Sequence, residues 1–189
     1  YGKDLFNRLP DVDLFLGSRS IPGAYGLSPE HFLLENDGKG RFRFLNREQT
    51  GGLHAAGMVT DAAWGDLDGD GDLDLYVACG GNELPSSSSA LRDRLYLNDG
   101  RGNLKKSSQV LPGGRYESSS CVRACDFDKD GVTELFVGLR LRPFLYGVPV
   151  QGYLLENDGS GLLSDATSNL APGLREVGMI RDMRWADVN

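Results

Sequence analysis

The acidic run Asp66-Leu67-Asp68-Gly69-Asp70-Gly71-Asp72-Leu73-Asp74 carries carboxylates at five of its nine residues. Carboxylates this close repel one another unless a cation lies among them. Oxygen donors at alternate positions suit Ca²⁺, which takes about 6–8 oxygen ligands in a flexible geometry. The glycines at 69 and 71 let the backbone curl so that the first, third and fifth positions converge. We therefore expect a calcium loop here.

A second copy of this loop begins at Asp126 and ends at Glu134. Each copy runs directly into a short stretch of β-forming residues, Leu75-Tyr76-Val77-Ala78 after the first and Leu135-Phe136-Val137-Gly138 after the second. An EF-hand loop also begins with alternating aspartates, but it requires a glutamate at its twelfth position and a helix on either side. Here the twelfth position is Val77 or Val137, so we reject the EF-hand.

Longer segments of the chain repeat after 121 residues. Leu33–Gly38 recurs as Leu154–Gly159, and Gly57–Asp66 recurs as Gly178–Asp187. A more divergent copy, Leu95–Gly100, lies halfway between. We therefore read residues 1–189 as one segment of three repeats, with approximate units 5–65, 66–125 and 126–186, and with 187–189 beginning a truncated next unit.

Each unit reads as an acidic loop, a strand, a long connection, a strand, an Asn-Asp-Gly hairpin, a strand, and a last strand that leads to the next loop. Four short antiparallel strands per repeat are typical of a β-propeller blade. The expected fold class is all-β, with about three propeller-type blades. Because propellers close with about 4–8 blades, this is a partial propeller. We expect Trp64 and Trp185, at matching positions, to pack between blades.

These motifs resemble the FG-GAP or VCBS repeats, found in the propeller heads of integrin α-subunits and in bacterial surface proteins often associated with ASPIC/UnbV modules. The resemblance implies a calcium ion in each acidic loop, held by side chains at positions 1, 3, 5 and 9 and by the carbonyl at position 7. In the first loop these are Asp66, Asp68, Asp70, Asp74 and the carbonyl of Asp72. In the second loop they are Asp126, Asp128, Asp130, Glu134 and the carbonyl of Val132.

The outer units depart from the pattern. In the first, Leu5, Leu9 and Pro10 replace required residues and leave Asn7, Asp11 and Asp13, so we predict no metal there. The last stops after Asp187 and Asn189, before a loop can close.

Composition narrows the class of protein. The chain has 189 residues, 40% of them hydrophobic, and a net charge of −7. An acidic surface without a basic, aromatic-studded stripe argues against nucleic acid as a partner. No transmembrane stretch is visible, so no membrane insertion is expected. Cys79, Cys121 and Cys125 form no metal-binding pair and are read as free thiols, since residues 121 and 125 of one strand lie about 13 Å apart.

The expected function is a calcium-binding, non-enzymatic recognition, adhesion or scaffold module. Calcium modules of the extracellular kind bind at about 10⁻⁴–10⁻³ M, which favours a secreted, periplasmic or cell-surface location. The ligand is an unknown protein or glycan. Self-association, or the remainder of a longer propeller chain, would supply further blades. The long connections 18–31, 80–94 and 139–152 form the candidate surface, with Tyr25 and Tyr146 expected to pack within their loops.

The alternative is a calcium-dependent enzyme acting on polysaccharides, a lyase or a hydrolase on a propeller scaffold. Its general base would be His31 or His54, or one member of a Tyr–Arg pair. The two histidines do not recur at matching repeat positions, and no Ser–His–Asp order is evident.

Overall fold

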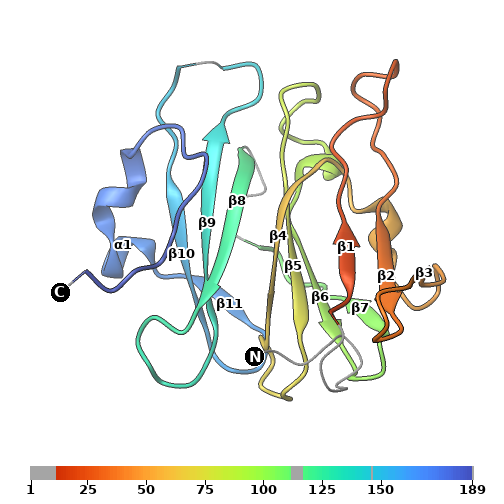
Figure 1. Ribbon diagram of the computed structural model, residues 1–189. Coiled ribbons are helices and arrows are strands. Elements are labelled where there is room, and N and C mark those ends of the chain that lie inside the picture. Colours follow the sequence, from red (N-terminus) through yellow and green to blue (C-terminus); the bar gives the residue numbers. More distant parts are fainter. Residues whose placement is uncertain (1–11, 112–116, 146, 189) are drawn as a thin grey trace.

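The computed structural model describes residues 12–111, 117–145 and 147–188. Three antiparallel sheets stand side by side (Figure 1). The first contains, in order, β1 (Leu14–Leu16), β2 (Phe32–Asn36) and β3 (Phe42–Phe44). The second contains β4 (Val59–Gly65), β5 (Asp74–Cys79), β6 (Arg94–Asn98) and β7 (Leu104–Lys106). The third contains β8 (Ser118–Cys125), β9 (Glu134–Leu141), β10 (Gly152–Asn157) and β11 (Leu163–Asp165).

Among the described residues, helical structure is confined to short segments. They are the 3₁₀ turns η1 (Leu53–Ala55), η2 (Ser89–Leu91) and η3 (Pro172–Glu176), and one turn of α-helix, α1 (Thr167–Leu170). Neither acidic stretch is bracketed by helices. The all-β prediction with propeller-like blades is confirmed, and the rejection of the EF-hand agrees with it.

The sheets are offset by one strand from the repeat units read in the sequence. Unit 66–125 contains β5 to β8, but β8 is hydrogen-bonded into the third sheet rather than the second. Likewise β4, at the end of unit 5–65, is the first strand of the second sheet. Each acidic loop therefore joins the first and second strands of one sheet, as a hairpin connection from β4 to β5 or from β8 to β9.

The central sheet explains why its strands are continuously apolar. Successive side chains of a strand point to opposite faces. Leu75, Val77 and Cys79 of β5 therefore join the core shared with the first sheet, while Tyr76 and Ala78 join the core shared with the third sheet. A strand covered on both faces has no polar side, and all six residues of β5 are buried.

The expected strand after η3 is not formed. Residues 177–188 include no strand, although Ile180 donates its amide to the Leu139 carbonyl at 2.9 Å. The equivalent strand β4 is held in a ladder by β5, whereas no described strand forms a ladder with residues 177–188. Trp64 packs against the first core as expected, whereas Trp185 stacks on Phe127 with ring centroids 5.9 Å apart and is 38% exposed.

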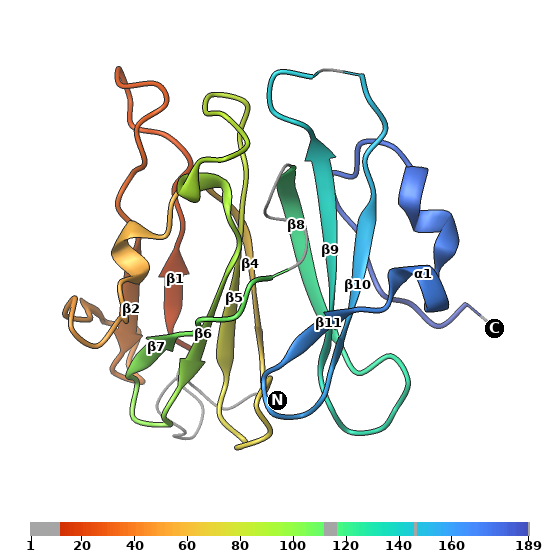
Figure 2. The same ribbon diagram turned by 180° about the vertical axis from the view of Figure 1, so that it is seen from behind.

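The two kinds of connection lie at opposite ends of the strands. The acidic loops and the β2–β3, β6–β7 and β10–β11 hairpins gather at the lower end in Figures 1 and 2, and the long connections gather at the upper end. This separates a candidate metal-binding end from a candidate recognition end. The three cysteines are free, with Cys79 and Cys121 buried.

Candidate metal centre

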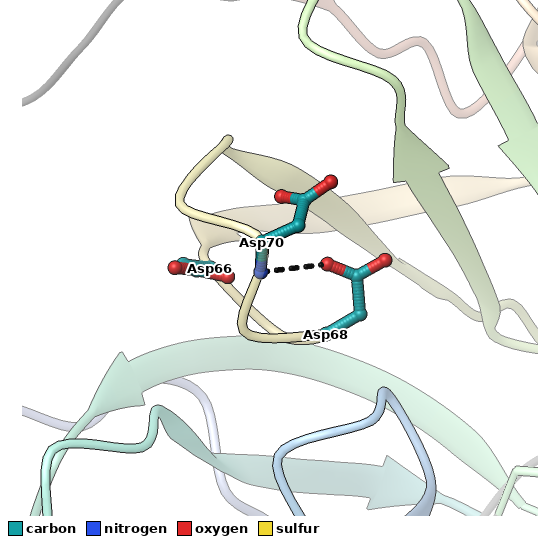
Figure 3. A group of neighbouring side chains, drawn as sticks. All are labelled: Asp66, Asp68 and Asp70. Atoms are coloured by element: carbon teal, nitrogen blue, oxygen red, sulfur yellow. Dashed lines mark hydrogen bonds between the residues drawn. The ribbon is translucent and has the colours of Figure 1, made fainter.

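The first acidic loop brings three predicted ligands together. Carboxylate oxygens of Asp66, Asp68 and Asp70 lie within 4.8 Å of one another in the connection between β4 and β5. Figure 3 shows these side chains arranged around one turn of the backbone. Hard oxygen donors at this spacing are the ligand type that Ca²⁺ prefers.

The backbone of this loop curls as the sequence predicts. Gly69 and Gly71 have φ angles of 75° and 88°, in the left-handed region that glycine enters without steric cost. This curl directs amide groups inward: Asp66 accepts hydrogen bonds from the amides of Gly69 (2.9 Å) and Gly71 (3.0 Å), and Asp68 accepts one from Asp70 (3.3 Å). These hydrogen bonds within the loop help to hold the carboxylates of Asp66 and Asp68 in place.

The second loop forms a comparable group from a different set of positions. Oxygens of Asp126, Asp128 and Glu134 lie within 4.8 Å of one another. Glu134, the first residue of β9, is 2% exposed and reaches the group because its side chain is one methylene longer than aspartate. Asp126 accepts from the Gly131 amide at 3.1 Å, so the same curl recurs. Here Lys129, with φ 66°, takes the left-handed position that Gly69 holds in the first loop.

The remaining predicted side-chain ligands lie outside these two groups. Asp74 is buried and accepts hydrogen bonds at 2.8 Å from the amides of Leu67 and Asn98, which fixes the base of the first loop. Asp130 accepts from the Val132 amide at 2.8 Å. Asp72 and Val132, predicted to ligate through their carbonyls, lie in the same loops. Their carbonyls as metal ligands stay a prediction, as do Asp74 and Asp130.

The electrostatics of both loops favour a bound cation. Burial, together with the charges of Asp70 and Asp66, raises the pKa of Asp68. Burial raises the pKa of Asp74 to about 6, and burial followed by the charges of the neighbouring aspartates raises the pKa of Glu134. A raised carboxyl pKa means that the charged form is disfavoured, which is the cost that a divalent ion removes. The donor set and its electrostatics therefore fit Ca²⁺.

An asparagine at the end of β10 links the two loops. The Asn157 side-chain amide donates to the carbonyls of Leu67, in the first loop, and Thr133, in the second, both at 2.9 Å. Asn98 and Asn36 hold the matching positions in the other sheets, and their amides donate to the carbonyls of Leu73 and Val12 at 3.2 Å. The Asn-Asp-Gly pattern predicts the hairpin turns but not this bridging role; the recurrence of asparagine as the first residue of each turn is the signal that could have indicated it.

The third sheet also packs directly on the first loop. A Cβ added to Gly69 would lie 2.8 Å from the Gly159 carbonyl, and one added to Gly161 would lie 3.4 Å from the Asp68 Cβ. Asp66 and Asp68 are half-buried. The third sheet therefore covers one side of the first loop, whereas Asp126 and Asp128 of the second loop are exposed.

The terminal units add little to these sites. Leu5, Asn7, Leu9, Pro10, Asp11 and Asn189 lie outside the described residues. Asp13 accepts the Asn36 amide at 2.8 Å, as Asp74 accepts the Asn98 amide, so it has the structural part of the ninth position. Asp187 is exposed and belongs to neither acidic group.

The histidines proposed for catalysis occupy different environments. His31 is 2% exposed; its Nδ1 accepts from the Ser18 amide at 3.1 Å, and its Nε2 lies 2.9 Å from the Gly57 carbonyl. Because Nδ1 accepts the Ser18 amide, Nε2 carries the proton and donates to the Gly57 carbonyl, so both nitrogens are engaged. Burial lowers the pKa of His31. Among the described residues, the buried Nδ1 of His54 has no hydrogen-bond partner.

The long connections form contacts at the opposite end. Arg19 pairs with Glu83 at 2.6 Å, and the Phe144 amide donates to the Asn82 side chain at 2.5 Å, so the three connections are linked in series. Tyr25 is 78% exposed, so the expectation that it packs within its loop is wrong: its hydroxyl contacts Glu83, a hydrogen bond that raises its pKa. Tyr146 lies outside the described residues.

Comparison with known proteins identifies the repeat. A family model described as an FG-GAP-like repeat matches residues 11–77 and 83–137, well over half of the chain. No curated protein compared with the chain matches it. FG-GAP repeats usually occur in extracellular proteins and are typically non-catalytic. In the described parts of the chain, no helix has the length and hydropathy needed to cross a membrane. The acidic loops, the blade-like sheets and the family match agree, and the chain belongs to the FG-GAP-like repeat family.

Proposed function

We propose that this chain is a calcium-stabilised, non-enzymatic recognition or adhesion module that works outside the cytosol. The observation that carries the proposal is the recurrence of a three-carboxylate group at the same connection of two successive sheets. The calcium ions would neutralise the clustered charge and fix the strand ends. The recognition surface would be the long connections, because binding residues tend to lie on loops held by a rigid scaffold.

Calcium in this arrangement has a structural role. At a dissociation constant of about 10⁻⁴–10⁻³ M and about 1 mM free calcium, each site adds about 0.4–1.4 kcal/mol to the free energy of unfolding. That increment holds a loop and two strand ends in place. Asp66, Asp68 and Asp70 would hold the first ion, and Asp126, Asp128 and Glu134 the second.

Isothermal titration with calcium and thermal unfolding with and without EDTA test this proposal. We expect two sites, and a melting temperature that falls reversibly by several degrees on chelation. Asp68→Asn should remove the first site and Asp128→Asn the second, while Glu48→Gln, at an exposed residue outside both loops, should leave both intact. Absence of calcium binding in the unaltered protein would refute the metal assignment.

The outer face of the first sheet is apolar, as expected for a surface that a further blade covers. The exposed apolar side chains of β1, β2 and β3 lie together there: Leu14, Leu16, Phe32, Phe42 and Phe44. In the second sheet the equivalent residues, such as Leu75 and Val77, are covered by the preceding sheet. We propose that a further blade, from a longer chain or a second copy, covers this face. The solution mass of this chain separates the two sources. A second copy would give a dimer that Leu16→Glu converts to a monomer, whereas a blade from a longer chain would leave this chain monomeric.

A further inference from the structure

A cavity of about 550 Å³ lies beside β6 and β7 of the second sheet, away from both acidic loops. Three cationic residues line it: Arg92, Arg94 and Lys106. The hydroxyl residues Ser89, Ser107 and Ser108 line it as well. The volume is in the range of small-ligand sites, about 300–1,000 Å³.

The charge of this cavity is positive in a protein whose net charge is −7. Asp93 is its one acidic lining residue. The Asp93 carboxylate accepts hydrogen bonds from the Cys79 amide (2.8 Å), the Ser119 hydroxyl (2.7 Å) and the Tyr76 hydroxyl (3.0 Å). It is therefore directed into the junction between the second and third sheets and, within the described residues, forms no ion pair with the cations of the cavity.

Arg94 is a fixed cation at the wall. It is 9% exposed, and its guanidinium donates to three backbone carbonyls, those of Arg92 at 2.7 Å, Ser89 at 2.8 Å and Ala56, so it acts on the cavity through its charge. Within the described part of the chain, none of the three cations forms an ion pair. Burial and the charge of Arg94 lower the pKa of Lys106, so these like charges are held together at a free-energy cost. An anion in the cavity would remove that cost.

We propose that this cavity binds an acidic sugar, with the cations contacting its carboxylate or sulfate and the serine hydroxyls contacting its ring hydroxyls. Charge-assisted hydrogen bonds from cations are the usual means of recognising such groups. This proposal specifies a ligand class for the recognition function proposed above and uses no residue of the acidic loops. Inorganic phosphate or sulfate would satisfy the charge alone, so the test must separate a sugar-borne anion from a free one.

The strand β7 provides a matched control. Lys105 and Lys106 are neighbours, paired in register with Leu97 and Tyr96 of β6, and their side chains point to opposite faces. Lys106 lines the cavity and Lys105 does not. Lys106→Glu and Lys105→Glu change the net charge equally, so a difference between them reports the cavity rather than the general field of the protein.

The experiment titrates the full chain separately with glucuronate, glucose 6-sulfate, glucose and inorganic phosphate. Binding is monitored through the changes in amide chemical shifts. We expect the two acidic sugars to bind more tightly than glucose or phosphate. Lys106→Glu should weaken binding by about ten- to hundredfold and Lys105→Glu by less than about twofold. Arg92→Glu, at an exposed residue, should reproduce the loss if the first variant is destabilised.

Three results would overturn the proposal: no acidic sugar binds at millimolar concentration, phosphate binds as tightly as the sugars, or both lysine variants weaken binding equally. Repeating the titration in EDTA separates this cavity from the calcium proposal. Binding of the acidic sugars should persist while the melting temperature falls.

Discussion

Replacing Asn157 with alanine should loosen the junction between the second and third sheets. Its side-chain amide donates to the Leu67 carbonyl, 90 residues away, and to the Thr133 carbonyl, both at 2.9 Å. Its side-chain oxygen accepts the Gly159 amide at 3.1 Å. The change removes one contact within the turn and two contacts that hold the acidic loops in relation to each other.

The magnitude follows from these contacts. Each hydrogen bond contributes about 1 kcal/mol, so the two bridging bonds account for about 2 kcal/mol and the turn for about 1 kcal/mol. Asn36 provides the comparison, since its oxygen accepts the amides of Gly38 (3.1 Å) and Gly40 (3.3 Å), and its amide donates to the exposed Val12 carbonyl. Asn36→Ala also removes three hydrogen bonds, but all three are exposed, so water replaces them and the change should cost only about 1 kcal/mol.

Urea unfolding at saturating calcium measures both variants. We expect Asn157→Ala to be about 2 kcal/mol less stable than Asn36→Ala, which corresponds to a melting temperature about 4–8 °C lower. Calcium affinity of the first loop should fall as well, because Leu67 lies between the ligands Asp66 and Asp68. Equal losses in the two variants would refute the bridging role, since both disturb an Asn-Asp-Gly turn.

Three further predictions concern the junctions between sheets and the second loop. Burial raises the pKa of Asp93 to about 6, above its unfolded value, so its stabilising contribution is fully present below pH ~4 and is lost as pH rises through about 6. The stability difference between the unaltered protein and Asp93→Asn, measured at saturating calcium, should therefore fall by about 2–3 kcal/mol from pH 4 to 7.5, and a flat difference would contradict this. Gly80→Ala places a Cβ 2.2 Å from the Ser119 carbonyl and should destabilise the chain by about 2–3 kcal/mol, whereas Gly173→Ala meets no atom within 4 Å and should be nearly neutral in the same unfolding assay. Glu134→Gln should weaken calcium binding at the second loop by about tenfold and leave the first loop unchanged by titration calorimetry; an equal effect on both would argue against separate sites.

Much of the blade was predictable because it depends on local pattern. Alternating carboxylates with glycine at fixed places specify a curled loop, and the β-forming run after Asp74 specifies a strand. The Asn-Asp-Gly stretches give hairpins, as predicted. The sheet boundaries were less accessible, because the sequence repeat begins at the loop whereas hydrogen bonding places β4 and β8 with the strands that follow them.

The candidate metal site was also predictable only in part. The sequence predicted both acidic loops with five ligands at matching positions, and it distinguished them only by Glu134, which is one methylene longer than the matching Asp74. In the structure, Asp74 receives amides from Leu67 and Asn98, and Glu134 joins the group of the second loop. Which oxygens converge depends on side-chain length and on amide donors elsewhere in the sheet, and neither is visible in the spacing alone.

By itself, the sequence determined the repeat, the all-β class and the position of each acidic loop, because each of these depends on residues that are close together along the chain. Three features depend instead on the packing of the sheets: Asn157 joins two loops, the third sheet packs on the first loop, and cationic residues line a cavity beside β7. These features arise where segments from different repeats meet. Their contacts depend on how the sheets pack, and the local pattern of no single repeat contains that information.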